Sequence, residues 1–172
     1  LLSLLKSRGS AMPEVYIGIG SNVAREANIR SGLKALAQEF GDIELSPVYC
    51  SEAVGFRGAA FLNLVARFST ALPVLELSQS LRAIERAHGR GDNMPKFSSR
   101  TLDLDILLYG DAEGEIDGVV LPREEVLYNA FVLRPLSELA PDGLHPRARK
   151  SFLELWQELS TSTEQRLEKV DL

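Results

Sequence analysis

The stretch RTLDLDILLYG, residues 100–110, places two carboxylates inside an otherwise apolar strand. Alternate side chains of a strand point to opposite faces. One face would then carry Leu102, Leu104, Ile106 and Leu108, and the other Thr101, Asp103, Asp105, Leu107 and Tyr109. Two carboxylates about 6–7 Å apart repel by roughly 2–3 kcal/mol at an effective dielectric near 20. The pattern therefore predicts a cation beside Asp103 and Asp105.

The segments before this strand predict its fold. VYIGIG at 15–20 is typical of a strand, and apolar residues at helical spacing predict a helix over 24–40 that Gly41 ends. Two strands are expected at 43–50 and 61–70, followed by a helix from Pro73 to Gly89. The order β-α-β-β-α-β predicts an α+β, ferredoxin-like antiparallel sheet with two helices on one face.

The last third of the chain is expected to extend this sheet or cover its other face as a three-layer α/β/α fold. Asp117-Gly118 indicates a hairpin turn before VVLP. Ser151 and Glu154 form a capping box for a final helix. Residues 13–160 are predicted to form a single domain. We expect residues 161–172 to be a polar tail that frays, and residues 1–12 to be an expression remnant or disordered.

Composition narrows the class of protein. The chain has 172 residues, 45% of them hydrophobic, and a formal net charge of −5. That charge argues against general binding to nucleic acid or to an acidic membrane. Cys50 is the only cysteine, so an intrachain disulfide is impossible and a cytoplasmic location fits best. The apolar start of the chain, which Lys6 interrupts, is too short for a signal sequence or a membrane span.

Basic residues gather immediately before the aspartate strand. Between Arg82 and Arg100 there are five basic and two acidic residues, a local charge of +3. Paired carboxylates with nearby cations suit a magnesium–polyphosphate site, because Mg²⁺ takes a few carboxylate oxygens together with phosphates and waters. The loop GRGDNMPKFSS, residues 89–99, has the composition of a mobile lid. The alternatives are a solvated helix face and aspartates that face water or pair with arginines.

The glycines of GIGSN, residues 18–22, do not form a phosphate-binding P-loop. The GxxxxGK[ST] spacing and its lysine are missing. Gly18 and Gly20 are instead expected to permit close packing or a turn. Cys50 and His88 receive no functional role.

Four segments, taken in order, resemble the 6-hydroxymethyl-7,8-dihydropterin pyrophosphokinase family. They are GIGSN at 18–22, FLNLVARF at 61–68, AIERAHGR at 83–90 and SSRTLDLDILLYG at 98–110. The resemblance covers about residues 14–140 and implies a ferredoxin-like fold with added helices. It also implies transfer of pyrophosphate from ATP to the hydroxymethyl group of the pterin, with release of AMP, in folate biosynthesis.

The resemblance implies roles for particular residues. Asp103 and Asp105 would bind two Mg²⁺ ions, and Arg90 and Arg100 would be the catalytic arginines. The implied pterin-binding residues are Ser51, Val54, Gly55, Phe61, Asn63, Phe97 and Phe131. The implied ATP-binding residues are Arg82, Glu85, Lys96, Arg100, Ile106, Leu121 and Arg123. The substrates would be the small molecules ATP and dihydropterin, with neither nucleic acid nor membrane as a partner, and the protein is expected to be a monomer.

The chain departs from the family pattern at four places. It has Phe97-Ser98-Ser99 for Trp-Gly-Pro, Asp92 where a basic residue is common, Pro122-Arg123 for Pro-His and Ser51-Glu52 for Thr-Pro. Two alternatives stay open: a paralogue with another alcohol substrate, and a non-catalytic ferredoxin-like module that binds a small ligand. An RNA-binding sheet is disfavoured, because the acidic pair would repel a phosphate backbone without metal.

Overall fold

An antiparallel sheet with strand order β5-β1-β4-β3-β8 lies at the centre of the computed structural model, and β2 also pairs with β4. The structure describes residues 12–51, 60–89 and 101–172. The strands are β1 (Glu14–Ser21), β2 (Glu44–Leu45), β3 (Val48–Ser51), β4 (Phe61–Ser69), β5 (Asp103–Tyr109) and β8 (Leu167–Val170). A separate hairpin consists of β6 (Gly114–Ile116) and β7 (Val119–Leu121).

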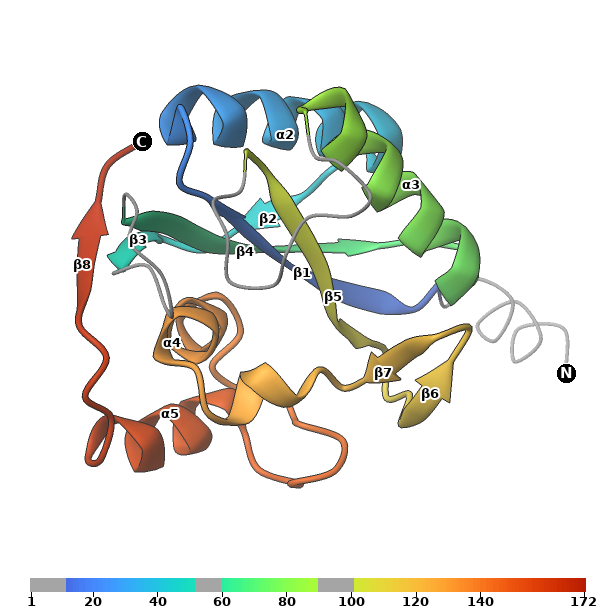
Figure 1. The fold of residues 1–172 in the computed structure, drawn as a ribbon. Coiled ribbons are helices and arrows are strands. Elements are labelled where there is room, and N and C mark those ends of the chain that lie inside the picture. Colours follow the sequence, from blue (N-terminus) through green and yellow to red (C-terminus); the bar gives the residue numbers. More distant parts are fainter. Residues whose placement is uncertain (1–11, 52–59, 90–100) are drawn as a thin grey trace, which may run out of the picture.

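Helices cover both faces of the sheet (Figure 1). They are α2 (Arg25–Phe40), α3 (Val74–Ala87), the 3₁₀ helix η1 (Glu124–Leu127), α4 (Ala130–Leu139) and α5 (Phe152–Ser160). Figure 1 shows α2 and α3 on one face, and α4 and α5 on the other. The ferredoxin-like order β1-α2-β3-β4-α3-β5 and the third layer of helices are therefore confirmed.

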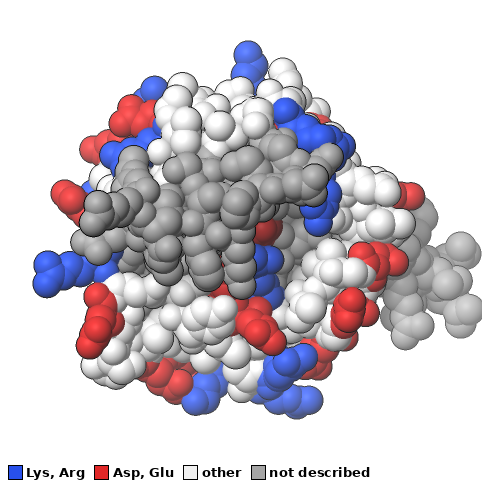
Figure 2. Space-filling model, viewed as in Figure 1, with Lys and Arg blue, Asp and Glu red and all other residues white. Residues whose placement is uncertain are grey.

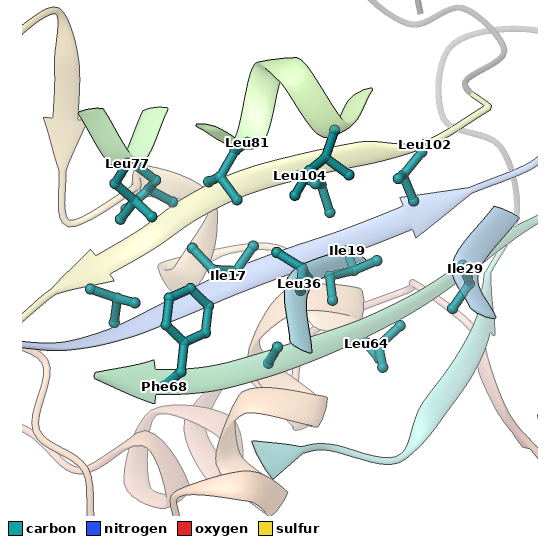
Figure 3. Packing of buried hydrophobic residues seen from close by; sticks show 14 of the residues in the cluster. Ile17, Ile19, Ile29, Leu36, Leu64, Phe68, Leu77, Leu81, Leu102 and Leu104 are labelled. Carbon is teal, nitrogen blue, oxygen red and sulfur yellow. The ribbon is translucent and has the colours of Figure 1, made fainter. Parts of the chain in front are cut away.

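The larger hydrophobic core lies between the sheet and the α2/α3 layer. Ile17 and Ile19 of β1 belong to this core together with Leu77 and Leu81 of α3, and all four side chains are almost fully buried (Figure 3). A second core on the opposite face joins β1, β4 and β5 to α4 and α5. Because one face of β5 packs into the first core, its aspartates point to the α4 side of the sheet.

The alternation of β5 breaks after the aspartates. Tyr16 pairs with Leu108, but Ile17 pairs with Ile106, so Leu107 is an extra residue in the ladder. Leu107 and Leu108 both pack into the core on the α4 side. The prediction that Leu108 shares a face with Leu104 was therefore wrong, because a bulge inserts one residue and reverses the facing of those that follow.

The end of the chain contains a strand rather than a frayed tail. Leu167–Val170 forms β8, in which Val170 pairs with Val48 and Leu167 with Ser51. The Tyr49 hydroxyl donates to Glu138, whose other carboxylate oxygen accepts from Lys169 Nζ at 3.1 Å. The prediction failed because an edge strand forms through backbone pairing and can remain polar, so it shows little hydrophobic periodicity.

Two local predictions agree with the backbone. Asp117 and Gly118, at the turn between β6 and β7, have φ values of 52° and 81°, as a tight hairpin turn requires. Ser151 Oγ accepts a hydrogen bond from Glu154 N–H at 3.1 Å and caps α5.

Among the described residues, no helix has the length and apolar character needed to cross a membrane.

Candidate active site on the α4 side of the sheet

Three residues in register form a row across the strands β5, β1 and β4. Gly20 of β1 pairs with Asp103 of β5 on one side and with Asn63 of β4 on the other. Residues directly opposite one another in a sheet point to the same face. Asp103 and Asn63 therefore flank Gly20 on the α4 side. Their Cα atoms are about 9–10 Å apart, because two strand spacings separate them.

Gly20 keeps the middle of this row open. A Cβ at this position would lie 3.0 Å from Asn63 Oδ1 and 3.7 Å from Phe61 Cδ1. Gly18, two residues earlier, similarly leaves room for Leu107, whose Cδ2 would lie 3.2 Å from an added Cβ. The interpretation that the GIGSN glycines permit close packing is confirmed. Because Gly20 has no side chain, the surface between the Asp103 carboxylate and the Asn63 amide stays open.

The amide side of the row is held by neighbouring strands. Asn63 Nδ2 donates to Ser51 Oγ at 2.8 Å, which fixes the orientation of the amide group. Phe61 pairs with Ser51 and lies on the same face as Asn63. Arg25, which sequence reasoning missed, donates from Nη1 to the carbonyl of Ala60 at 2.8 Å and so holds the start of β4. In the sequence, only the position of Arg25 in the first turn of α2 pointed to this role.

Asp105 lies opposite Gly18, two positions along β5 from Asp103. Its Oδ1 is 3.8 Å from Arg123 Nη1. Burial and the neighbouring Asp103 carboxylate raise the pKa of Asp105 well above its usual range, and Arg123 opposes that rise. At Asp105, the cation that was predicted beside the acidic pair is therefore Arg123 of this chain. This agrees with the alternative in which the aspartates pair with arginines.

A pocket of about 430 Å³ adjoins Asp105, between α3, β5, β7 and η1. Its lining includes four of the predicted ATP-binding residues: Arg82, Glu85, Ile106 and Arg123. Leu121 is fully buried in the core and does not line the pocket. Tyr128, which sequence reasoning missed, lines it with 56% of its surface exposed. The pocket has the size and the mixed lining expected of a small-molecule site.

Glu85 has a structural contact within this pocket. Its carboxylate accepts a hydrogen bond from Leu104 N–H at 2.8 Å, and the residue is only 5% exposed. Leu104 lies between the two aspartates on β5, which is an edge strand. Glu85 therefore holds the strand that presents the acidic pair.

The remaining predicted site residues divide into two groups. Phe131 lies in the first turn of α4 and packs against the core on that side. The others, namely Val54, Gly55, Arg90, Lys96, Phe97 and Arg100, lie outside the described residues. In the view of Figure 2, which is that of Figure 1, acidic and basic side chains of the described residues are interspersed.

The donor set suits a magnesium half-site. No group of three or more His, Cys, Asp or Glu side chains that could hold a metal occurs within the described ranges. Two aspartates on one strand face supply a few carboxylate oxygens, and Mg²⁺ normally completes its shell with waters and substrate phosphates. Asp103 and Asp105 thus fit a cation that arrives with a polyphosphate.

Comparison with known sequences identifies the family. A profile of the 7,8-dihydro-6-hydroxymethylpterin-pyrophosphokinase (HPPK) family matches residues 16–141. The chain belongs to this family. HPPK enzymes are ATP-dependent transferases of folate biosynthesis that act on small-molecule substrates, so the enzyme class inferred from the resemblance is confirmed.

Individual relatives agree with the HPPK assignment. The 2-amino-4-hydroxy-6-hydroxymethyldihydropteridine pyrophosphokinase of Pseudomonas aeruginosa is 37% identical over 139 residues, which cover 78% of this chain and 85% of that protein. The enzyme of the same name from Synechocystis is 34% identical over 146 residues, covering 83% of this chain and 74% of the relative.

Solved structures share the HPPK fold. A Plasmodium falciparum HPPK-DHPS chain superposes with a TM-score of 0.69 at 12% identity, covering 92% of this chain. This chain spans only 47% of that longer one. At this level of identity the likeness supports the fold, and it carries no assignment of a second activity.

Proposed function

We propose that this chain catalyses the Mg²⁺-dependent transfer of pyrophosphate from ATP to the hydroxymethyl group of 6-hydroxymethyl-7,8-dihydropterin, with release of AMP. The observation that carries this proposal is the row Asp103–Gly20–Asn63. It sets a carboxylate suited to a metal ion that carries phosphate beside an amide suited to a heterocycle, with an open glycine between them. A bound pterin and a bound triphosphate could therefore meet above β1.

The nucleotide would bind on the β5 side of the row. The 430 Å³ pocket reaches Asp105 and contains Arg82 and Arg123, whose charges complement a triphosphate. Tyr128 and Ile106 offer apolar surface for a base in the same pocket. Two Mg²⁺ ions at Asp103 and Asp105, when bound, would neutralise the charge that develops on the phosphates.

The pterin would bind on the Asn63 side. An amide supplies both a donor and an acceptor, so Asn63, oriented by Ser51, can read the polar edge of the ring. Phe61 and Phe131 would supply aromatic contacts, together with Phe97. The nucleophile is the alcohol of the substrate itself, so the chain needs no serine, cysteine or histidine nucleophile. Catalysis would consist of positioning and electrostatic stabilisation.

The roles proposed for Arg90, Arg100, Lys96, Val54 and Gly55 rest on the family resemblance. The expected monomeric state and the cytoplasmic location likewise stay predictions. Family membership favours the pyrophosphokinase over a non-catalytic binding module. A different alcohol substrate remains the second candidate, because the pair Ser51-Glu52 replaces the usual Thr-Pro beside the proposed pterin site.

The test is a product assay. Protein supplied with Mg²⁺, ATP and 6-hydroxymethyl-7,8-dihydropterin should release AMP in a pterin-dependent reaction. Asp105→Ala should abolish release, whereas Asp111→Ala, a change of an exposed aspartate after β5, should leave it intact. ADP as the product would indicate an ordinary kinase, and AMP released only with another alcohol would support the paralogue. Absence of any nucleotide product would reject the enzyme.

A further inference from the structure

Arg123 is shared between two carboxylates. Its Nη1 lies 3.8 Å from Asp105 Oδ1, and its Nε and Nη2 lie 3.1 and 2.9 Å from Glu125 Oε1. Its backbone N–H donates to the carbonyl of Leu107 at 2.8 Å, so the residue is tied to β5 at its main chain as well. The guanidinium is therefore held beside Asp105 by contacts at both ends of the residue.

Glu125 is itself held in place. Asn129 Nδ2 donates to Glu125 Oε2 at 2.9 Å, and Gln165 Nε2 donates to Asn129 Oδ1 at 3.4 Å. Gln165 Oε1 in turn accepts from the N–H of Ala130 at 2.6 Å, at the start of α4. Contacts thus run from the segment before β8 through Asn129 and Glu125 to Arg123. This chain of contacts favours one position of the guanidinium.

A guanidinium and a divalent cation compete for the same carboxylate. Asp105 would have to keep Arg123 at 3.8 Å while also binding a metal, which places two cations close together. Phosphate groups would relieve this conflict, because they can accept hydrogen bonds from the arginine fork while the metal takes the carboxylate. Arg123 has 39% of its side chain exposed and lines the pocket, so its head group can turn toward a ligand there.

We propose that Arg123 is a place-holding cation that makes metal loading of this chain depend on nucleotide. Without nucleotide, Arg123 occupies the cation position at Asp105 and weakens metal binding. With nucleotide, the guanidinium transfers to a phosphate and Asp105 becomes available. The inference rests on the proposed function, because it takes Asp105 as a metal ligand and the pocket as the nucleotide site.

The experiment measures Mn²⁺ binding to the full chain by EPR, with and without a non-hydrolysable ATP analogue. Without nucleotide, Arg123→Gln should bind Mn²⁺ about tenfold more tightly than wild type, because a unit positive charge beside the ion has been removed. Arg123→Lys keeps that charge and should stay close to wild type. Arg147→Gln is the matched control, since Arg147 pairs at 3.5 Å with Glu113 on the surface. Circular dichroism and thermal melts establish that each variant is folded.

The second comparison is the same Mn²⁺ measurement in the presence of the ATP analogue. With the analogue at saturation, Arg123→Gln should lose its advantage over wild type, because Arg123 has left Asp105 and now contributes to phosphate binding. An unchanged Mn²⁺ affinity in nucleotide-free Arg123→Gln, or no measurable binding to it, would overturn the proposal. So would an equal gain in affinity with and without the analogue, since Arg123 would then never leave Asp105.

Asp105→Asn separates this inference from the proposed function. If wild type releases AMP, Asp105→Asn does not, and Arg123→Gln binds Mn²⁺ like wild type, the place-holding role fails and the enzyme stands. If Asp105→Asn binds Mn²⁺ like wild type and wild type forms no AMP, the proposed function fails, and the inference fails with it.

Discussion

The Glu85 carboxylate accepts a hydrogen bond from the backbone N–H of Leu104, with 2.8 Å between oxygen and nitrogen. Glu85 comes from α3, whereas Leu104 belongs to the edge strand that carries both aspartates. The edge of a sheet presents backbone donors that pairing with another strand would otherwise satisfy. This contact therefore has two effects. It satisfies one backbone donor of the edge strand, and it holds the residue between the two aspartates in place beside the pocket.

Replacement of Glu85 should separate these effects. Glu85→Ala leaves the Leu104 N–H without its carboxylate partner and should lower the free energy of unfolding by about 1–3 kcal/mol. It should also reduce kcat/KM, because the aspartates lose their support. Glu85→Gln keeps an acceptor oxygen and should retain most of both. Urea denaturation and steady-state kinetics measure the two effects, and equal unfolding free energies for Glu85→Ala and wild type would contradict the structural role.

Removal of the Asp105 charge should greatly lower the catalytic efficiency and stabilise the metal-free protein. Asp105→Asn removes a proposed metal ligand, and kcat/KM should fall by about 10²–10³-fold or more. The raised pKa of Asp105 means that the folded state binds its proton more tightly than the unfolded state does. The associated stability is fully present at low pH and is lost as the pH rises through the raised pKa.

At neutral pH, Asp105→Asn should therefore melt higher than wild type. A gain of about 1 kcal/mol would raise Tm by about 2–4 °C in a domain of this size. The difference should shrink as the pH falls toward the ordinary aspartate pKa near 4. Thermal melts of metal-free protein across this pH range provide the measurement, and a Tm difference that does not depend on pH would argue against burial as the cause.

A methyl group at Gly20 should damage the pterin half of the site selectively. The added Cβ of Gly20→Ala would lie 3.0 Å from Asn63 Oδ1, so the amide must shift. We expect KM for the pterin to rise by about tenfold or more, while the affinity for the ATP analogue changes little. Gly18→Ala is the control, because its Cβ meets the flexible end of Leu107 at 3.2 Å. Calorimetry with each ligand distinguishes the two, and an unchanged pterin affinity in Gly20→Ala would place the pterin elsewhere.

Deletion of residues 166–172 should also act on the pterin half. The deletion removes β8 and leaves β3, which carries Ser51, as the edge of the sheet. Because Ser51 orients Asn63, pterin KM should rise several-fold and Tm should fall, while ATP KM stays within about twofold of wild type. Lys169→Gln, which removes one exposed ion-pair partner of Glu138, should have little effect. Equal losses for both substrates would instead indicate general destabilisation.

Much of the site was predictable because strand alternation and turn formation depend on residues that are neighbours in the sequence. Alternation placed Asp103 and Asp105 on one face of a strand, and turn residues placed the hairpin at Asp117-Gly118. The predicted residues Arg82, Glu85, Ile106 and Arg123 do meet at one pocket. Leu121, which was also predicted to bind ATP, turns its side chain into the core instead, a direction that spacing alone does not specify.

The sequence by itself determined the order of helices and strands as far as β5 and the placing of two acids on one face, since both follow from backbone geometry over a few residues. Only the tertiary structure decided that Gly20 lies between Asp103 and Asn63, that Leu107 bulges, that β8 borders Ser51 and that Arg123 meets Asp105. Those relationships depend on register and contact between distant segments, where a shift of one residue sends every side chain to the other face. No local pattern encodes that choice.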